Sequence, residues 1–499
     1  MSRRARVIKR PEITLDATLP VPLYKQLYER LREAILAGRL ERGARLPSTR
    51  TLASELGISR STTVLAYTQL LLEGYLESRA GQGTLVARDL PATLFHEQAV
   101  QTPAKPPGAL STSLTPLASR VRSLQDMPIP SRLEEPAGGA FRGGEPALDL
   151  FPFEVWARLI ARRARQSLRA FAHYQPPAGY EPLREAIAAH IGITRGVRCV
   201  PEQIILTAGS QGAFDLAART LLNSGEAVWM ENPGYFGARG ALLAAGARLV
   251  PVPVDEQGLV VEIGRKRCPE ARLVSTTPSH QSPTGVTMSL PRRLALLDWA
   301  SQAGAWILED DYDSEYRFSG RPLEALQGLD QTGRVLYIGT FSKVLFPALR
   351  LGYLVAPTEL IEPLLTMRRF LDMHLPMLEQ MALCDFLVEG HYARHLRRML
   401  QHYRKLRELL HRELHIHLGS LLEVRAPEAG MQLVGWLPPG KDDQRAADLA
   451  AQVGIQVLPI SRFSLEPLSR GGLVFGYAGT DEEAIPRGVK QLAAVLEHL

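Results

Sequence analysis

Lys343 is the side chain whose neighbours in the sequence best suit covalent chemistry. It closes the run Gly339-Thr340-Phe341-Ser342-Lys343, which follows an apolar stretch with the pattern of a strand. A lysine that forms a Schiff base needs a partly desolvated position and nearby cations, which lower the pKa of its amine. Thr340, Ser342 and Arg350 supply hydroxyls and a positive charge that can hold a phosphate. A lysine after a strand is also a common surface residue, so its position alone is a weak signal.

Two further runs contain groups that complement such a lysine. Glu309-Asp310-Asp311-Tyr312-Asp313 also follows a strand-like stretch. A carboxylate there can pair with a pyridinium nitrogen, and a tyrosine hydroxyl can bind a phenolic oxygen, as in pyridoxal 5'-phosphate (PLP) sites. The alternatives are a metal site and a solvated acidic end. Thr207-Ala208-Gly209-Ser210-Gln211-Gly212 leads from a strand into a helix, whose N-terminal amides can bind phosphate, although they would suit any phosphate ligand.

Near the N-terminus, residue types and spacing indicate DNA binding. Residues 51–70 suit two short helices joined at Gly57, the geometry that places a second helix in the major groove. The start of that helix can contact phosphates and base edges, and a hairpin beyond it can approach the minor groove. The residues concerned are Ser59, Arg60, Ser61 and Thr62 in the helix and Arg79 and Gly81 in the hairpin. The alternative is an ordinary core, where helical hairpins with glycine turns are also common.

The charge distribution points the same way. Residues 1–88 carry 15 Lys or Arg and 8 Asp or Glu, whereas the rest of the chain carries 43 and 44, so the net charge of +6 is concentrated in the first segment. A basic small segment beside a nearly neutral large one suggests a polyanionic partner. A solvated basic surface would have the same composition.

Cysteine usage and hydropathy indicate the compartment. Cys199, Cys268 and Cys384 are far apart in the sequence, which disfavours a disulfide framework or a zinc site and favours the reducing cytoplasm. No run of about 18 apolar residues occurs, so we expect no membrane span. The basic stretch Met1 to Arg10 has no apolar segment behind it, so we do not expect a secretory signal.

Three helices and a hairpin would position the DNA-contacting residues. Apolar spacing, serine caps and glycine stops predict helices at 22–37, 49–56 and 60–73 and strands at 75–78 and 84–87. We therefore predict a winged helix-turn-helix domain over residues 15–88. Residues 89–145 are rich in proline and glycine, and we interpret them as a flexible linker.

Residues 146–499 have the pattern of a larger α/β domain. Short apolar stretches alternate with helix-length segments, which predicts a mainly parallel sheet with helices on both faces. The expected strands are 203–207, 227–231, 248–252, 273–276, 305–309, 335–339 and 351–355. From about residue 375 onward, a long helical stretch and shorter strands suggest a small C-terminal α+β lobe.

The N-terminal motifs resemble the winged helix of the GntR family of bacterial regulators. The runs that carry the resemblance are Arg45-Leu46-Pro47-Ser48-Thr49-Arg50-Thr51-Leu52-Ala53, Leu56-Gly57-Ile58-Ser59-Arg60-Ser61-Thr62 and Glu73-Gly74-Tyr75-Leu76. The match covers nearly all of residues 21–87. It implies DNA contacts from Arg50, from residues 59–62 and from the wing glycine, Gly81.

The motifs around Lys343 resemble the fold-type I aminotransferases over about 170–480. That resemblance implies a Schiff base between PLP and Lys343, with Asp310 at the pyridinium nitrogen and Tyr235 against the ring. It implies a phosphate site made by Ser210, Gln211, Thr340, Ser342 and Arg350, and a contact from Tyr312 to the phenolic oxygen. Tyr174 resembles the tyrosine that reaches the phosphate of a neighbouring subunit. A winged helix followed by this domain resembles the MocR (GabR-like) subfamily.

Two departures from the aminotransferase pattern bear on activity. In His280-Gln281-Ser282-Pro283-Thr284-Gly285, Ser282 stands where an asparagine usually contacts the ring, so Gln281, Ser282 or His280 must replace it. In Leu473-Val474-Phe475-Gly476-Tyr477, Val474 stands where many aminotransferases have the arginine that binds the substrate carboxylate. Unless another residue such as Arg462 substitutes, transamination of ordinary amino acids is in doubt.

These features favour a regulator that binds DNA and senses PLP, or an amino compound that forms an aldimine at Lys343. The alternatives are a working aminotransferase with an accessory DNA-binding module, and a DNA-binding protein whose large domain only dimerises. The resemblance also implies a head-to-tail homodimer, and a dimer with two DNA-binding modules expects an operator with two half-sites. We expect no metal in the site.

Overall fold

A computed structural model describes residues 13–79, 83–88, 118–125, 127, 139–166, 172–320 and 323–497. The chain divides into two compact units, residues 1–114 and 115–499. Within the described ranges, no helix is both long enough and apolar enough to cross a membrane.

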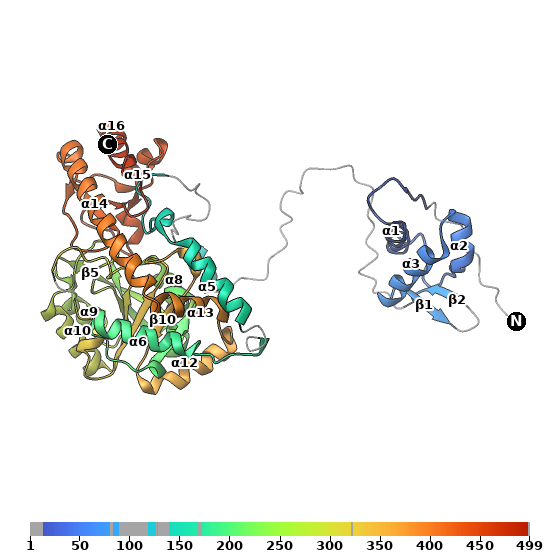
Figure 1. Cartoon of the computed structure of the whole chain (residues 1–499), viewed down its shortest axis with the longest axis horizontal. Coiled ribbons are helices and arrows are strands. Elements are labelled where there is room, and N and C mark those ends of the chain that lie inside the picture. The colour runs from blue at the N-terminus through green and yellow to red at the C-terminus, as the bar shows by residue number, and fades with distance from the viewer. Residues whose placement is uncertain are drawn as a thin grey trace. The chain divides into compact units, whose positions relative to one another are not determined.

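The first unit is a winged helix-turn-helix (Figure 1). Its elements are α1 (Leu23–Leu36), α2 (Thr49–Leu56), α3 (Arg60–Leu72), β1 (Leu76–Arg79) and β2 (Gly83–Val86). The two strands are antiparallel, with Leu76 opposite Val86. Leu27, Leu31, Ile35 and Leu70 are buried where α1 packs against α3, which explains the apolar spacing of α1.

Local sequence sets the turn between α2 and α3. Ser48 caps α2, because its Oγ accepts a hydrogen bond from the Thr51 amide at 3.1 Å. Gly57 ends α2 in the left-handed region with φ of 64°. Ser59 caps α3 in the same way, through the Thr62 amide at 3.1 Å. The predicted elements of this domain are thus confirmed to within one residue, whereas Gly81 lies outside the described residues.

The second unit is built on an eight-stranded sheet in the order β3-β10-β9-β8-β7-β4-β5-β6. The strands are β3 (Ile204–Thr207), β4 (Ala227–Asn232), β5 (Arg248–Asp255), β6 (Gly258–Leu259), β7 (Leu273–Thr276), β8 (Trp306–Asp311), β9 (Val335–Thr340) and β10 (Gly352–Val355). Strands β4, β5, β7, β8 and β9 are parallel. β10 is antiparallel to both of its neighbours, and β6 is antiparallel to β5. The expected mainly parallel sheet is therefore confirmed.

Helices cover both faces of this sheet. One face carries α7 (Gly209–Leu221), α8 (Phe236–Ala244) and α12 (Thr358–Leu371). The other carries α9 (Val261–Arg267) and α10 (Leu290–Ala303). Further helices are α5 (Phe153–Gln166), α6 (Glu181–Arg195), α11 (Leu326–Leu329) and α13 (Met377–Val388). Because side chains alternate along a strand, every second residue of β8 and β9 faces α7 and α8.

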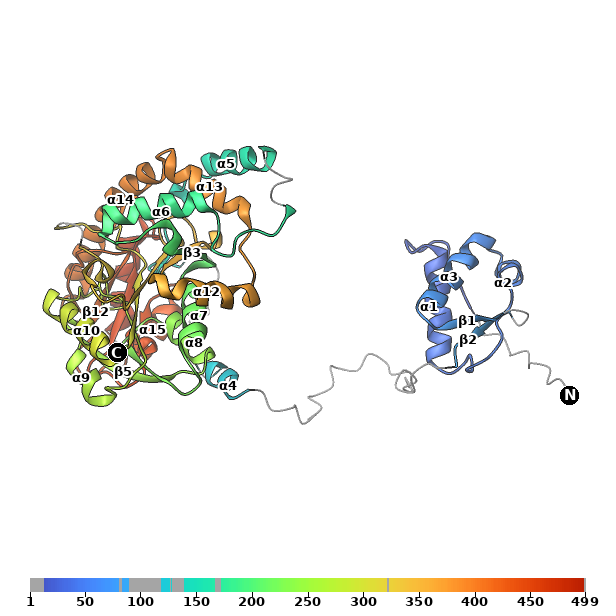
Figure 2. The same cartoon turned by 90° about the horizontal axis from the view of Figure 1, so that it is seen from below.

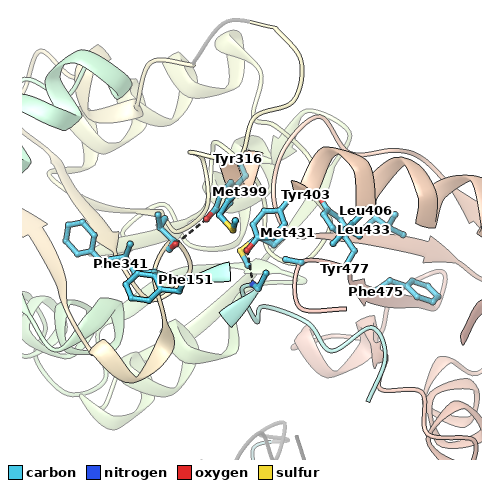
Figure 3. Packing of buried hydrophobic residues seen from close by; sticks show 14 of the residues in the cluster. Phe151, Tyr316, Phe341, Met399, Tyr403, Leu406, Met431, Leu433, Phe475 and Tyr477 are labelled. Atoms are coloured by element: carbon cyan, nitrogen blue, oxygen red, sulfur yellow. Dashed lines mark hydrogen bonds between the residues drawn. The ribbon is translucent and has the colours of Figure 1, made fainter. Parts of the chain in front are cut away.

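The C-terminal lobe is a second, antiparallel sheet in the order β11-β12-β14-β13. Its elements are α14 (His391–Leu418), β11 (Glu423–Val424), β12 (Gln432–Trp436), α15 (Asp443–Gln452), β13 (Leu458–Pro459), β14 (Gly472–Gly476) and α16 (Ala484–Leu496). Figure 3 shows Tyr403 and Leu406 of α14 packed with Leu433 and Phe475 of this sheet, and the Tyr403 hydroxyl accepts a hydrogen bond from the Ala147 amide at 2.9 Å. The predicted α+β lobe is therefore present.

Two parts of the segment predicted as linker pack against the large unit. Helix α4 (Ser119–Gln125) lies beside α8 (Figure 2). Phe141 is completely buried in the C-terminal lobe, and its amide donates to Thr480 Oγ1 at 3.0 Å. The predicted boundary at 145/146 is therefore too late: residues 139–145 belong to the large unit, because a buried aromatic and two β-type contacts hold them there. Composition alone could not reveal contacts to residues more than 300 positions away.

Phe141→Ala should lower the stability of the large unit. The ring is buried and lies edge-on to Phe475 at 5.7 Å, so truncation removes apolar contacts and leaves a cavity. We expect a loss of about 3–5 kcal/mol in the free energy of unfolding. Thermal unfolding followed by near-ultraviolet circular dichroism would measure it. Val200→Ala, at a half-exposed side chain, is the control and should change stability by less than about 0.5 kcal/mol.

Candidate cofactor and DNA sites

Asp310 lies on the face of β8 that points toward α7 and α8. Side chains alternate along a strand, so Asp310 lies on the same face of β8 as Trp306 and Leu308, which pack beneath these two helices. Its side chain is buried, and its Oδ1 has no hydrogen-bond partner among the described residues. Burial, followed by the charges of Asp311 and Asp313, raises the pKa of Asp310 well above its usual value. A buried carboxyl group without a donor is costly, and the N–H of a pyridinium ring is a donor that would satisfy it.

Lys343 follows β9 and lies close enough to Asp310 for its charge to lower the pKa of that carboxyl group. Its Nζ donates a hydrogen bond to the carbonyl oxygen of Gly144 at 2.7 Å. Lys343 is half-buried, which is the partly desolvated position that the sequence suggested. The lysine and its acidic counterpart therefore meet at the carboxyl ends of two adjacent parallel strands.

The predicted phosphate-binding residues gather around the N-terminus of α7. Gly209 has φ of 70°, and a Cβ at this position would lie 3.2 Å from the guanidinium of Arg350. Arg350 also donates to the Ala208 carbonyl at 2.8 Å, so its charge adds to that of the helix N-terminus. Ser342 Oγ is buried without a hydrogen-bond partner among the described residues, as expected of a hydroxyl that binds a ligand oxygen.

The side chains of the other residues predicted to bind phosphate do not all point toward the N-terminus of α7. Thr340 continues the alternation of Leu336 and Ile338 toward α7, and its Oγ1 accepts from the Ser342 amide at 3.2 Å. Ser210 lies in the first turn of α7. Gln211 donates to the Gly237 carbonyl at 3.0 Å, so its side chain is turned toward α8. The backbone of this first turn, rather than the Gln211 amide, is best placed to bind a phosphate.

Tyr312 and Ser282 form the side of the site where a phenolic oxygen would lie. Ser282 is buried and Tyr312 is half-buried, and the Tyr312 hydroxyl lies 3.0 Å from His280 Nδ1. Burial and the charges of Asp313 and Asp310 raise the pKa of Tyr312, while a hydrogen bond with Ser282 lowers it. Tyr235 begins α8 and packs near Phe214, with ring centroids 6.2 Å apart.

Among the three candidates to replace the usual asparagine, Gln281 is fully used by the protein. Its amide nitrogen donates to Glu231 at 2.9 Å and to the carbonyls of Pro233 and Ser282 at 2.9 and 2.8 Å. Its amide oxygen accepts from both the amide and the hydroxyl of Thr284. The side chain therefore fixes the loop, and Ser282 and His280, both of which contact Tyr312, stay as the candidates to replace the asparagine.

Sequence reasoning did not find the ion pairs that support the acidic run. Asp311 faces away from α7 and forms an ion pair with Arg195 at 2.7 Å, and it accepts from the Tyr337 hydroxyl at 2.6 Å. Asp313 lies 3.0 Å from His280 Nδ1. Arg195 lies 116 positions from Asp311, so no local pattern could have linked them.

Tyr174 is not brought into this site within one chain. Its ring is 83% exposed and contacts His374, with centroids 6.1 Å apart. Arg462, the possible substitute at the carboxylate position, donates to Gln444 at 3.0 Å in α15. Val474 is buried opposite Val434 on β12.

The described candidate DNA-binding residues lie at the starts of α2 and α3 and at the end of β1. Arg50 and Arg60 are exposed at the starts of α2 and α3. The hydroxyls of Ser61 and Thr62 each lie 2.8 Å from Ser59 Oγ, so the three form a polar cluster at the N-terminus of α3. Arg79 ends β1 and pairs with Glu77 at 3.1 Å.

Comparison with known proteins agrees with the presence of these two domains. Residues 141–492 match the model of the aminotransferase class I and II family, and residues 23–86 match that of the gntR family of bacterial regulatory proteins. The chain is 42% identical to the probable rhizopine catabolism regulatory protein MocR of Rhizobium meliloti, over 96% of this chain and 95% of that one. It is 32% identical to the pyridoxine biosynthesis regulator PdxR of Corynebacterium glutamicum, over 95% and 96%. Among solved structures, α-aminoadipate aminotransferase LysN of Thermus thermophilus has a TM-score of 0.67 and 31% identity, covering 76% of this chain and 95% of that one.

The fold and the two sites define a PLP-dependent transcription regulator that carries a DNA-binding winged helix. The chain belongs to the MocR-type regulators, in which a gntR-type winged helix is joined to a class I and II aminotransferase domain.

Proposed function

We propose that the large domain is a sensor, which responds to PLP itself or to an amino compound that reacts with PLP at Lys343, and that its occupancy controls operator binding. The observation that carries this proposal is the site around Lys343: Asp310 and Ser342 each bury a polar atom that lacks a partner among the described residues. When bound, PLP supplies an aldehyde carbon that forms a covalent bond with an amine. A ligand that binds one arrangement of the protein more tightly shifts the population toward it.

The proposed roles follow from position. Lys343 holds the cofactor covalently, Asp310 pairs with its ring nitrogen, and Tyr235 packs against the ring. Ser282 and Tyr312 orient the phenolic oxygen. The phosphate is held by the first turn of α7, which contains Ser210 and Gln211, together with Thr340, Ser342 and Arg350.

We propose that the protein works as a head-to-tail homodimer in which Tyr174 completes the site of the partner. Its exposed ring lies beside His374, and Phe370, Leu371 and Met373 expose apolar surface on the same segment. Such surface is typical of a subunit interface. A dimer presents two winged helices, so we expect an operator with two half-sites. Sedimentation of the full-length protein and footprinting of its own upstream DNA would test both expectations.

The function is tested by operator binding under three conditions. The cofactor-free protein, the PLP-loaded protein and the loaded protein with added amines should differ in affinity for the same DNA. Equal affinity in all three would contradict the proposal. Steady-state transamination with kcat above about 1 per second would instead favour an aminotransferase with an accessory DNA-binding domain. The buried Val474 argues against that alternative.

Arg60→Ala should weaken operator binding by about 10- to 100-fold, because we propose that Arg60 reads base edges from the N-terminus of α3. Arg50, Ser59, Ser61, Thr62 and Arg79 are proposed to contact the DNA nearby, as is Gly81. Fluorescence anisotropy with labelled operator at fixed salt measures the loss. Arg30→Ala, on α1, is the control, because Arg30 is exposed and pairs only weakly with Glu33 at 3.3 Å. An equal effect of both substitutions would contradict the assignment.

A further inference from the structure

An apolar surface occupies the face of the C-terminal lobe that points toward the large sheet. Val434 of β12 and Val474 of β14 are directly opposite each other, and both are buried. They pack with Ile460 and Phe463 in one buried cluster, and Phe236 of α8 packs against it with its ring centroid 5.7 Å from that of Phe463. Val474, which stands where the aminotransferase resemblance places an arginine for the substrate carboxylate, therefore packs among hydrocarbon side chains.

This surface is continuous with the site around Lys343. Gly476 lies two residues after Val474 and so on the same face of β14. A side chain at Gly476 would overlap the backbone of Arg142 and Gly143, which cover that face. The next residue is Gly144, whose carbonyl accepts the hydrogen bond from Lys343. On the α8 side of this surface, Phe236 directly follows Tyr235, the residue proposed to pack against the cofactor ring.

A cavity of about 900 Å³ borders the same surface. Val434, Trp436 and Leu468 line it from the lobe, and Asn232 and Pro233 line it from the large sheet, next to Tyr235. The lining of this cavity is therefore partly apolar, and it also includes Glu423, Glu428 and Glu466. Burial of hydrocarbon groups at such a surface is favourable. An unpaired carboxylate would lose its hydration there, which costs free energy.

The two arginines that line this cavity, Arg425 and Arg470, already bind carboxylates of the protein. Arg470 binds the Glu423 carboxylate at 2.6 Å and the carbonyls of Leu437 and Trp436. Arg425 binds Glu256 at 2.9 Å, so a ligand carboxylate would have to compete with a carboxylate of the protein. Arg462 is turned toward α15, where its Nε donates to the side-chain oxygen of Gln444. Arg425 and Arg470 are thus already paired with carboxylates of the protein.

We propose that the effector of this regulator is a primary amine without a carboxylate group, and that Val474 and Val434 select against amino acids. The inference rests on the proposed function, because it assumes that an amine is sensed at Lys343. It adds the chemical class of that amine. The selectivity comes from burial: an amino acid would place its carboxylate against the two valines without a cation, whereas the matching amine would not.

The test uses matched pairs that differ only by a carboxylate. Full-length protein is loaded with PLP and freed of excess cofactor, and then titrated with ethanolamine and L-serine, isobutylamine and L-valine, 2-phenylethylamine and L-phenylalanine, and cadaverine and L-lysine. Affinity is read from the visible absorbance of the bound cofactor and from calorimetry. In the wild-type protein, the amine should bind at least about tenfold more tightly than its amino acid. Equal or tighter binding of the amino acids would overturn the inference.

Val474→Arg tests the role of that position. It should lower the preference for the amine by about tenfold, because a guanidinium can pair with the carboxylate. Val474→Leu, which keeps the surface apolar, should retain the wild-type preference. If circular dichroism shows that Val474→Arg does not fold, the comparison of each amine with its amino acid in the wild-type protein still tests the inference. An amine preference that is unchanged in folded Val474→Arg would contradict the assignment to Val474.

The same titrations separate the two proposals. If no amine or amino acid changes the absorbance at millimolar concentration while PLP stays bound, amine sensing fails, and the inference fails with it. If both members of each pair bind equally and alter operator affinity, the proposed function stands and only the carboxylate inference is overturned.

Discussion

Lys343→Ala should yield a folded protein that no longer holds PLP covalently and binds it at least about 100-fold more weakly. The reason is that a lysine fixed at the end of β9 reacts as an intramolecular partner, which is far more effective than a free amine in solution. Equilibrium dialysis and the visible absorbance of the protein-bound cofactor measure the change. Borohydride reduction followed by peptide mass analysis should place the cofactor on the Lys343 peptide in the wild-type protein only.

Lys405→Ala is a suitable control, because Lys405 is an exposed lysine of α14 that pairs with Glu482 at 2.6 Å. It should bind PLP like the wild-type protein. Cofactor that remains attached after reduction of Lys343→Ala would show that another amine carries it, and the assignment of the site would then be wrong.

Asp310→Asn and Asp311→Asn should have opposite effects on the cofactor-free protein, although the residues are adjacent. Asp311 pairs with Arg195 in a buried site, so its replacement leaves an uncompensated guanidinium and should cost about 3–5 kcal/mol. Asp310 lies on the other face of β8, and its Oδ1 has no hydrogen-bond partner among the described residues. An amide there removes the penalty of a buried negative charge, so Asp310→Asn should raise the melting temperature at neutral pH.

The pH dependence distinguishes this explanation from a general packing effect. The pKa of Asp310 is raised in the folded protein, so the folded state keeps a proton that the unfolded state releases. Stability is therefore lost as pH rises above about 4, the ordinary pKa of an aspartate, and continues to fall until the folded-state pKa is passed. The wild-type protein and Asp310→Asn should melt together in acid and diverge toward neutral pH. Parallel melting curves at all pH values would contradict the burial argument.

Asp310→Asn should also weaken PLP binding, because an amide cannot keep the pyridine nitrogen protonated. The thermal stabilisation on adding PLP should shrink relative to the wild-type protein. The same substitution would then stabilise the empty protein and weaken the filled one, as expected for a residue retained for its ligand.

Local patterns were enough to predict most elements. The serine caps at Ser48 and Ser59 and the αL glycine Gly57 act within a few residues, so the winged helix could be read directly. The parallel strands were found because buried apolar runs bounded by turns leave a clear signal. The predicted site residues on β8 and β9 lie together for the same reason, since adjacent parallel strands end at one edge.

The remaining features depend on contacts between distant segments. The pairing of Asp311 with Arg195 and the burial of Phe141 beside Phe475 join positions with no shared motif. The use of Gln281 to fix its own loop, which leaves Ser282 beside Tyr312, required the side-chain hydrogen bonds. Tyr174 was predicted to act in a partner subunit, and its ring is exposed in the single chain.

The hydrogen bond from Lys343 to Gly144 gives the amine two tasks that compete. An ammonium group has three protons to donate, whereas a nitrogen joined to a cofactor by a double bond keeps one at most. Residues 139–144 lead back toward the chain that connects the two units. Attachment of PLP would therefore weaken the hydrogen bond that Lys343 donates to Gly144, and release of the lysine by an amine would restore it. We therefore expect occupancy by the cofactor to change how firmly residues 139–144 are held against the large domain.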